Sequence, residues 1–264
     1  MADEKRYMVD VGINDLPFPI VVKSRSCPQG QHTVANISIK ARIMKEFEPQ
    51  WIDRFIQIVH SHRERIGLRE LSENIKDYHK ELSANNVRAE LSFPFFYEKT
   101  TPISKEKCLV RYQCAYAGSY PSVLDNGMRA TLRIQCPAIT SYPMPMEGNG
   151  VSFGQLSQVQ MEVSPKDEVF PEDLIELVDR HALAPVYSYL TPEDQHHLMQ
   201  RILRERKTSV VMVDEIKEEL ARTPSIAWYS LGCSNYGMLH VYSTAISTEK
   251  SYWVPFSGIE DQDI

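Results

Sequence analysis

One order of secondary-structure elements occurs twice in this 264-residue sequence and constrains its fold more than any other feature. Period-two alternation predicts strands, and apolar residues three and four apart predict helices. The first half gives strand, strand, helix, helix, strand, strand at about 18–22, 32–43, 48–60, 68–82, 87–97 and 108–118. The second half has strands at about 128–137, 151–164, 225–234 and 238–248, with helices at about 171–189, 192–205 and 210–221. This repeat predicts a tandem α+β fold.

A turn-rich joint at 120–127 separates the two repeats. We therefore divide the chain into an N-terminal half, 1–122, and a C-terminal half, 123–264, which together form one bimodular unit. Residues 1–16 are polar and are predicted to be a loop. Antiparallel sheets of this kind leave edge strands exposed, and symmetric oligomerisation is a common way to cover them.

The charge and the cysteine content exclude several classes of protein. A net charge of −6 gives no electrostatic basis for general nucleic-acid binding, although a local basic pocket could take a phosphorylated small molecule. No apolar run approaches the ~20 residues of a membrane span. The opening MADEKRYM lacks the apolar core of a secretory signal. Five scattered cysteines form neither a disulfide framework nor a CxxC pair, so we expect a cytoplasmic protein.

Cys136 is the first candidate for chemistry. It ends the alternating run 131–136 on the apolar face of that run, and Pro137 follows at once. Proline cannot donate to a strand ladder, so we expect the strand to stop there. A buried core cysteine is the commonest role of a free thiol, so a catalytic role needs support from elsewhere in the chain.

That support comes from a series of short strings. They occur in this order: Asp10-Val11-Gly12-Ile13, Leu16-Pro17-Phe18-Pro19-Ile20, Gln31-His32-Thr33-Val34-Ala35, Ser92-Phe93-Pro94-Phe95-Phe96 with Lys99-Thr100, Gln135-Cys136-Pro137, Gly154-Gln155 with Ser157, and Ser234-Asn235 with His240. Each string alone is weak, but in this order, over roughly residues 9–248, they resemble the GTP cyclohydrolase IB family.

The resemblance implies a fold, an assembly and a reaction. The family has the tunnelling fold, whose tandem halves are four-stranded antiparallel sheets with helices on one face, assembled into multi-subunit barrels. A homo-oligomer, of which a tetramer is the expected form, would place active sites at subunit interfaces, with a small heterocyclic substrate and neither nucleic acid nor membrane as partner. The family opens the imidazole ring of GTP, releases formate and recloses the product to dihydroneopterin triphosphate. A divalent metal activates the attacking water.

Most of the metal ligands that the resemblance implies are replaced. The metal-binding cysteine matches Cys136, but the second cysteine position carries Ala138. A histidine position carries Phe153, and a glutamate position carries Pro185. In the late histidine string His240 is retained, while Tyr242 stands where a second histidine is expected. A thiolate and one imidazole are too few ligands for a zinc site without outside help.

Further residues are candidates for binding the substrate. The resemblance places Gln200 at the position of the glutamate that grips the guanine edge, and an amide can still pair with a planar heterocycle. Aromatic rings at Phe153, Tyr187 and Tyr242 could stack on such a ligand or fill space. The other candidates lie in the shared strings or near a lost ligand: Gln155, His32, Lys99 (which could meet a phosphate, although lysines usually lie at the surface) and His181 (which could partly replace the glutamate). The adjacent His196 and His197 fit a solvated helix face.

Three functions remain open. The first is a divergent enzyme that acts on a purine- or pterin-like heterocycle in a specialised biosynthetic pathway, without metal, using Cys136 and His240 as nucleophile or acid and base. The second is an authentic GTP cyclohydrolase that makes 7,8-dihydroneopterin triphosphate and formate, with zinc or manganese held by Cys136, His240 and a replacement such as His181. The third is a non-catalytic binding or scaffold protein that retains the barrel.

Overall fold

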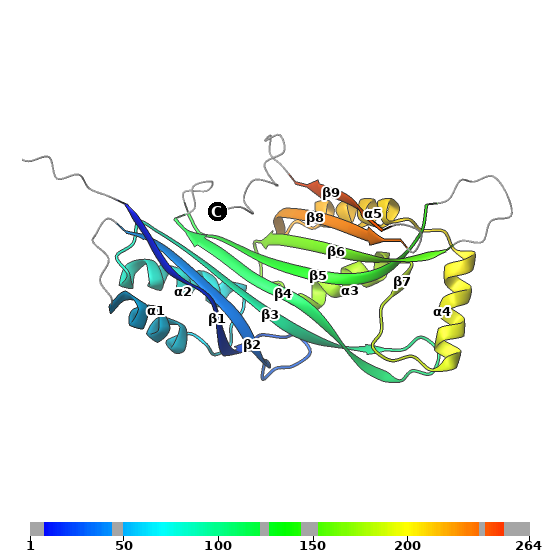
Figure 1. Cartoon of the computed structure of the whole chain (residues 1–264), viewed down its shortest axis with the longest axis horizontal. Helices are drawn as coiled ribbons and strands as arrows, with labels where there is room; N and C mark the ends of the chain where they lie inside the picture. The colour runs from blue at the N-terminus through cyan, green and yellow to red at the C-terminus, as the bar shows by residue number, and fades with distance from the viewer. Residues whose placement is uncertain (1–7, 44–49, 122–126, 144–152, 238–240, 251–264) are drawn as a thin grey trace, which may run out of the picture.

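The computed structural model describes residues 8–43, 50–121, 127–143, 153–237 and 241–250. Within them, one twisted antiparallel sheet extends along the molecule, and Figure 1 shows it from the first strand to the last. The strands are β1 (Val9–Val22), β2 (Gln31–Ile43), β3 (Asn86–Thr100), β4 (Lys107–Tyr120), β5 (Arg129–Ser141), β6 (Gly154–Pro165), β7 (Ala184–Pro185), β8 (Ile226–Tyr236) and β9 (Ser243–Glu249).

The strand order is β1-β2-β3-β4-β5-β6-β8-β9, with the short β7 paired to β5. The β4–β5 ladder, from Ser119 and Arg129 to Gln113 and Gln135, joins the two repeats into a single sheet. The tandem α+β architecture is therefore confirmed. The predicted boundary at 122 lies at the edge of 122–126, outside the described residues, and stays a prediction.

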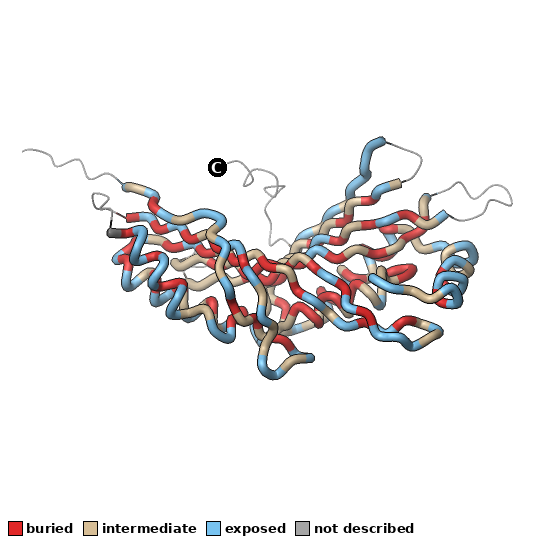
Figure 2. Tube along the Cα trace, turned by 60° about the horizontal axis from the view of Figure 1, so that its bottom comes forward, coloured by how far each residue is buried: buried red, intermediate tan, exposed pale blue. Residues whose placement is uncertain are grey.

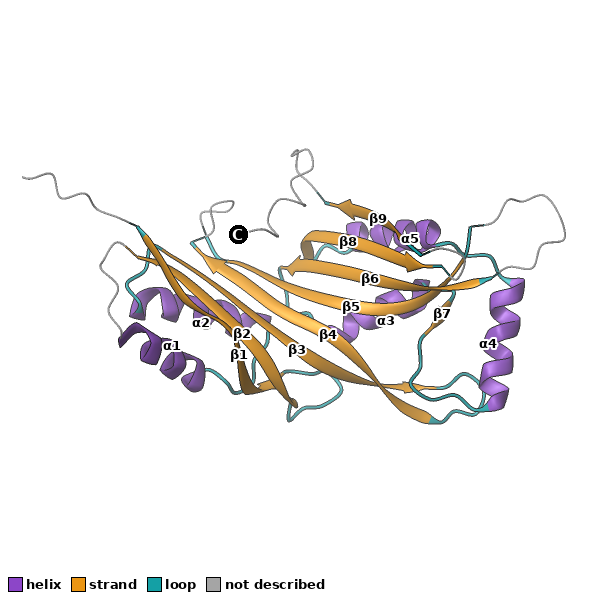
Figure 3. Ribbon diagram, in the orientation of Figure 1, coloured by secondary structure: helices purple, strands orange, loops and turns teal. Residues whose placement is uncertain are grey.

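The helices are α1 (Gln50–Ser61), α2 (Leu68–Glu81), α3 (Pro171–His181), α4 (Pro192–Arg204) and α5 (Ser209–Arg222). Helices α2, α3 and α5 pack on one face of the sheet, α2 against β3 to β5 and α5 against β8 and β9. Helix α4 instead stands at the end of the sheet (Figure 3). None of the described helices is both long and apolar enough to cross a membrane.

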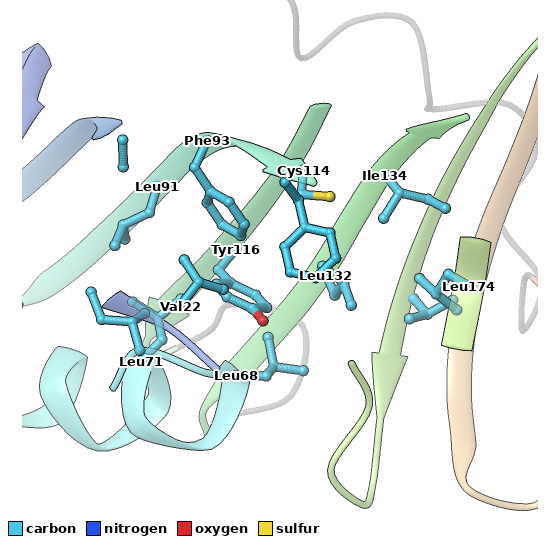
Figure 4. Packing of buried hydrophobic residues seen from close by; sticks show 14 of the residues in the cluster. Val22, Leu68, Leu71, Leu91, Phe93, Cys114, Tyr116, Leu132, Ile134 and Leu174 are labelled. Atoms are coloured by element: carbon cyan, nitrogen blue, oxygen red, sulfur yellow. The ribbon is translucent and has the colours of Figure 1, made fainter. Parts of the chain in front are cut away.

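The core lies between the sheet and the helices. Buried and exposed residues alternate along the strands, as Figure 2 shows, because successive side chains point to opposite faces. Figure 4 shows the centre of this layer, where Leu71 of α2, Tyr116 of β4 and Leu174 of α3 belong to one buried cluster. Each fully buried aliphatic side chain contributes about 1.5–3 kcal/mol of burial free energy. This shared core joins both halves.

The structure corrects two predicted boundaries in the strands. The polar start of the chain is not all loop, because β1 begins at Val9. Its pairing with β2 shifts register between Ile13 and Leu16, and Asp15 has a φ of 53°, so a bulge hides the alternation in the sequence. Strand β5 also continues through Pro137 to Ser141. Its pairing with β4 ends at Gln135, and β7 pairs from Ala138, so Pro137 lies between two partners.

In the second half, the predicted helix at 171–189 ends early. Helix α3 stops at His181, because β7 and the segment after it turn back to pair with β5 and to reach α4. The helices predicted at 192–205 and 210–221 are confirmed as α4 and α5. Both begin at a threonine N-cap, Thr191 and Thr208, which is the usual signal for a helix start.

Helix α3 carries an acidic ridge that faces the N-terminal half. We define the ridge as Glu172, Asp173, Glu176 and Asp179, spaced so that they share one side of the helix. Apart from the Phe170 amide, which caps α3 by donating to Asp173, the partners named here come from the other repeat. Ser24 and Ser26 contact Glu172, Arg25 contacts Asp173 and Glu176, Tyr97 donates to Glu176, and Lys99 pairs with Asp179. Burial, followed by the bond to Glu176, raises the pKa of Tyr97 to about 12.

Candidate active site

Strand β5 sets the geometry of the candidate site. Cys136, Ala138 and Thr140 alternate along it, and all three are buried on the side that the helices cover. Their Cα partners on β6 are Val159, Ser157 and Gln155, in that order. Strand β8 continues these rows, with Cys233 opposite Val159 and Asn235 opposite Ser157. A row with two thiols therefore lies beside a row of hydroxyl and amide groups.

A buried ion pair lies close to this thiol row. Lys99 of β3 has its Nζ 2.7 Å from Asp179 Oδ2 of α3 and donates to the carbonyl oxygen of Val186 at 3.3 Å. The Lys99 ammonium lies 5.4 Å from the ring centre of Tyr112 and 5.7 Å from that of Tyr187. Lys99 is only 6% exposed, so the usual surface position of a lysine is wrong here. Its contact with a substrate phosphate stays a prediction.

Burial governs ionisation in this cluster. It raises the pKa of the Cys136 thiol far above the ordinary range, helped by the negative charge of Asp179 and opposed by Lys99. Burial also raises the pKa of Asp179, with Lys99 acting the other way. The Tyr112 hydroxyl is buried and has no hydrogen-bond partner among the described residues. Cys136 is therefore a neutral thiol at neutral pH, a proton donor rather than a ready thiolate nucleophile.

Cys27 is expected to react with a thiol reagent much faster than the other four cysteines. It is partly exposed, whereas Cys108, Cys114, Cys136 and Cys233 are buried. Burial raises the pKa of Cys233 to about 11, and thiolate is the reactive form. Timed alkylation with iodoacetamide at neutral pH, followed by peptide mass spectrometry, measures the order of labelling. Native Cys136 labelled as fast as Cys27 would contradict the burial.

A buried polar network crosses the row beside Cys136. Thr140 Oγ1 and Ser157 Oγ are 2.7 Å apart, and Ser157 Oγ donates to Asn235 Oδ1 at 2.7 Å. Asn235 Nδ2 donates to Ser209 Oγ, the first residue of α5, at 2.9 Å. Gln155 Nε2 donates to Thr140 Oγ1 at 3.2 Å. The network fixes the strand ends of β5, β6 and β8 to one another and to α5.

Asn235→Ala is expected to lower the free energy of unfolding by about 1–3 kcal/mol, because two buried hydroxyls lose a hydrogen bond to its amide. Those hydroxyls belong to Ser157 and Ser209. Urea unfolding followed by circular dichroism measures the change. Ser234→Ala, one residue earlier and on the opposite face of β8, is the matched control and should change stability little. If both substitutions lowered the free energy of unfolding equally, the network would not be a special source of stability.

Of the positions that the resemblance assigns to metal ligands, Cys136, Ala138 and Pro185 lie together, whereas Phe153 lies farther along the sheet, beside Tyr142. Ala138 and Pro185 are direct Cα partners in the β5–β7 pair, and Ala138 shares the face of Cys136. Phe153, which is 44% exposed, precedes β6, and its carbonyl accepts from the Tyr142 amide at 2.7 Å. In the part of the chain that the structure describes, no group of three or more His, Cys, Asp or Glu side chains could hold a metal ion. The described residues therefore do not by themselves fit a metal.

Helix α4 lines an open depression of about 510 Å³ at the end of the molecule. Its lining residues are Ile103, Pro192, Glu193, His196, His197 and Gln200. Gln200 Nε2 lies 2.7 Å from His196 Nε2, so these two side chains act as a pair. An amide and an imidazole offer both donors and acceptors to the edge of a planar ring. Ile103 belongs to the β3–β4 hairpin, in the turn that follows the strand of Lys99.

The remaining predicted residues are scattered. His32 is exposed on β2, which β3 and β4 separate from β5. His181 ends α3, with its two ring nitrogens 3.0 Å from Glu215 and 2.7 Å from Glu219 of α5. These carboxylates sit on different ring nitrogens and so do not converge on one ion. Tyr242 is exposed, and His240 lies outside the described residues, so its pairing with Cys136 stays a prediction.

Sequence reasoning missed three residues of this region: Asp179, Tyr112 and Asp194. The spacing of acids at 172, 176 and 179 on an amphipathic helix was a signal for the ridge, since one side of the helix must carry them together. Nothing local marks Tyr112, which is one alternating residue of β4. Asp194 follows the Thr191 N-cap by three residues, the position of a capping-box acid, and the sequence gives no sign of its second set of partners.

Comparisons with known proteins identify the family. The model of the family described as type I GTP cyclohydrolase folE2 matches residues 2–245. The GTP cyclohydrolase FolE2 of Pelobacter propionicus is 29% identical over 252 residues, which cover 94% of this chain and 95% of that protein. The GTP cyclohydrolase FolE2 of Geotalea uraniireducens is 30% identical over 241 residues, with 91% and 87% covered.

Solved structures agree on the fold. Uricase from Arthrobacter globiformis superposes with a TM-score of 0.53 at 9% identity, covering 95% of this chain and 97% of that one. A urate oxidase mutant from Bacillus sp. TB-90 gives a TM-score of 0.51 at 11% identity, covering 92% and 98%. These proteins share the tunnelling fold, which confirms the predicted fold class.

The comparisons therefore bear out a cyclohydrolase enzyme and do not confirm the prediction of a divergent enzyme with a substrate other than GTP. They support the authentic alternative better, with a small-molecule substrate. Because the family model spans both repeats of the sheet, the chain belongs to the type I GTP cyclohydrolase FolE2 family.

Proposed function

We propose that this protein converts GTP to 7,8-dihydroneopterin triphosphate and formate. The observation that carries the proposal is the match of residues 2–245 to the FolE2 family, which includes every strand of the sheet up to the start of β9. The relatives named GTP cyclohydrolase FolE2 are covered over nearly their whole length. We also propose that the chain belongs to the GTP cyclohydrolase IB family, because the sequence strings around Cys136 and Asn235 resemble that family.

We assign the roles in the site from the described contacts. Cys136 is the proposed acid and base, because burial keeps its proton at neutral pH and the Lys99 ammonium beside it favours loss of that proton during the reaction. His240 is its proposed partner. Gln200 is proposed to hydrogen-bond the edge of the guanine base. Tyr187, whose ring faces Lys99, is proposed to stack on the base. Phe153, Gln155, Tyr242, His32 and Lys99 complete the proposed substrate contacts.

The metal that the family implies, zinc or manganese, supplies water activation when it is bound. The residues described here do not converge as a ligand set, so no step of the proposal is routed through a metal. Whether this chain depends on one is measured directly. Purified protein is assayed for GTP turnover before and after dialysis against chelator, with metal content determined in parallel. Loss of activity with loss of one equivalent of zinc or manganese would support rebuilt ligation by Cys136, His240 and His181.

The decisive experiment incubates the purified chain with GTP and measures formate release together with the fluorescence of the oxidised neopterin product. ATP is the control substrate, because it lacks the guanine edge that Gln200 would read. Both products must appear in equal amounts from GTP. If GTP is left intact by protein that is folded and metal-replete, the proposal is wrong.

A second candidate substrate class is favoured by one observation. The positions beside Cys136 that the resemblance gives to ligands carry Ala138 and Pro185, which the structure pairs directly. A pocket emptied in this way could take a different purine- or pterin-like heterocycle by Cys136 and His240 chemistry without metal. Turnover of such a compound, with no formate from GTP, would favour this candidate. Binding without any turnover would favour a scaffold role.

We further propose that the protein is a homo-oligomer, with a tetramer as the expected form and sites shared between subunits. Strands β1 and β9 are the two ends of the described sheet, so each has one side without a strand partner among the residues that the structure describes. Pairing such edges between copies protects them. Light scattering gives the mass in solution, and a monomer at micromolar concentration would contradict the proposal. The halves 1–122 and 123–264 are proposed to fold as one unit.

A further inference from the structure

Helix α4 has little apolar packing to orient it. Asp194 and Leu198 are its buried residues, and all of its positions are described. Met199 and Leu203 are instead exposed, on a helix that stands at the end of the sheet in Figure 1. An amphipathic helix usually takes its orientation from an apolar stripe against the core. In α4 this stripe is short, since only Leu198 and Ile202, which lies beside Gly154 of β6, face the sheet, so polar contacts at the two ends of the helix add to its orientation.

The C-terminal end of α4 is attached to β5 of its own half. Ser141, the last residue of β5, donates its amide to the Lys207 carbonyl at 2.7 Å and accepts from the Lys207 amide on its Oγ at 2.9 Å. The Ser141 hydroxyl also donates to the Glu205 carbonyl at 3.3 Å. These bonds hold the α4–α5 connection against the strand that carries Cys136.

The N-terminal end of α4 is attached to the other half, through Asp194. Its Oδ1 accepts from the amides of Ile103 at 2.8 Å and Ser104 at 3.1 Å, and its Oδ2 from the hydroxyls of Ser104 at 2.6 Å and Thr191 at 2.7 Å. Asp194 has no exposed surface. Burial opposes its ionisation, but the bonds from Ser104, Thr191 and Ile103 hold the pKa of Asp194 below its ordinary value.

These bonds exceed what a helix cap requires. A capping box needs the bonds between Thr191 and Asp194 alone. The three bonds to Ile103 and Ser104 lead instead to the tip of the β3–β4 hairpin, some 90 residues earlier in the chain. Ile103 also lines the depression, together with His196 and Gln200 of α4. The carboxylate of Asp194 therefore joins the two elements that line the depression, the hairpin and α4.

We propose that Asp194 is a positioning residue for substrate binding: it sets Gln200 of α4 against the β3–β4 hairpin, and so sets the affinity for the guanine base. This inference rests on the proposed function. Asp194 does not touch the substrate in this scheme but acts through Gln200. Breaking its link to the hairpin weakens GTP binding and leaves the chemical step at Cys136 unchanged.

Two hydroxyls that donate to the same oxygen of Asp194 provide a matched test. Ser104→Ala removes a bond to the hairpin, while Thr191→Ala removes a bond within the cap of α4. A lost hydrogen bond to a charged group is worth about ten-fold in an equilibrium constant, so Ser104→Ala should raise KM for GTP by about ten-fold with kcat within about two-fold. Thr191→Ala should lower the melting temperature and leave KM near that of the wild type. Ser104→Thr keeps the hydroxyl and should therefore have a KM for GTP close to that of the wild type.

A double-mutant cycle shows whether Ser104 acts through Gln200. If it does, Ser104→Ala adds nothing to the KM of Gln200→Ala, whereas independent sites give additive changes. Additive changes, or equal KM values for Ser104→Ala and Thr191→Ala, overturn the inference while GTP turnover by the wild type leaves the proposed function intact. Calorimetric titration with GTP gives a second readout. Wild-type protein that neither binds nor converts GTP overturns both.

Discussion

Cys136→Ser should lower kcat for GTP by about 10²–10⁴-fold, the usual loss when a general acid or base is removed. The substitution keeps a small polar group but replaces a thiol that burial holds in its protonated form. A serine hydroxyl is a weaker acid than a thiol in the same buried surroundings, so it gives up its proton less readily during the reaction. The rate of formate release under saturating GTP measures the effect.

Cys233→Ser is the matched control. Cys233 is buried on β8, and Val159 of β6 lies between it and Cys136 as the Cα partner of both. The two substitutions should therefore cost similar stability, which thermal melting checks, but Cys233→Ser should keep the kcat of the wild type. Equal loss of turnover in both variants would mean that packing, not the Cys136 proton, is responsible. Full turnover by Cys136→Ser would remove the thiol from the mechanism.

Lys99→Met should lower the free energy of unfolding by about 3–5 kcal/mol, because it leaves one charge of a buried ion pair without its partner. Asp179 would remain behind, in a site where burial already raises its pKa. With its folded pKa raised above the unfolded value, the Asp179 carboxyl contributes stability below the unfolded pKa and loses it as pH rises through the folded pKa. The variant should therefore approach the wild type as the pH falls toward the ordinary aspartate pKa of about 3.9, and its deficit should be largest at neutral pH and above.

Two further variants separate the buried charge from other effects. The double variant Lys99→Met with Asp179→Leu should recover most of the loss, because no unpaired charge is then buried. Lys107→Met, on the neighbouring strand, breaks an exposed pair with Glu98 and should change stability little. Urea unfolding at several pH values gives these comparisons. A double variant no more stable than Lys99→Met would show that the loss comes from packing of the lysine stem.

Local periodicity was enough to predict most of the architecture. The helices beginning near Leu68, Pro192 and Ser209 carry apolar stripes or threonine caps that the chain shows directly. The strands of the second half alternate cleanly because one face is buried. Residues 9–16 escaped prediction because a bulge at Asp15 breaks the period, and β5 passes through Pro137 because its neighbour changes from β4 to β7, which only tertiary structure decides.

The site was harder to predict for a related reason. Cys136 was found from its place at the end of an alternating run, and the structure shows it buried in mid-strand. Lys99 has nothing nearby in sequence to mark it as buried, since its partner Asp179 lies 80 residues later in the chain. The bonds from Ile103 and Ser104 to Asp194 span a similar separation. Long-range charge pairing leaves no periodic signature, so it appears only once the fold is known.

The acidic ridge of α3 bears on how a duplicated chain can diverge. The C-terminal repeat supplies the carboxylates, and the N-terminal repeat supplies the arginine, lysine, tyrosine and serine side chains that bind them. If two identical repeats were joined, carboxylates would face carboxylates, or hydrogen-bond donors would face donors, and both arrangements are unfavourable. The two repeats can therefore no longer replace each other, because their facing surfaces carry opposite charges.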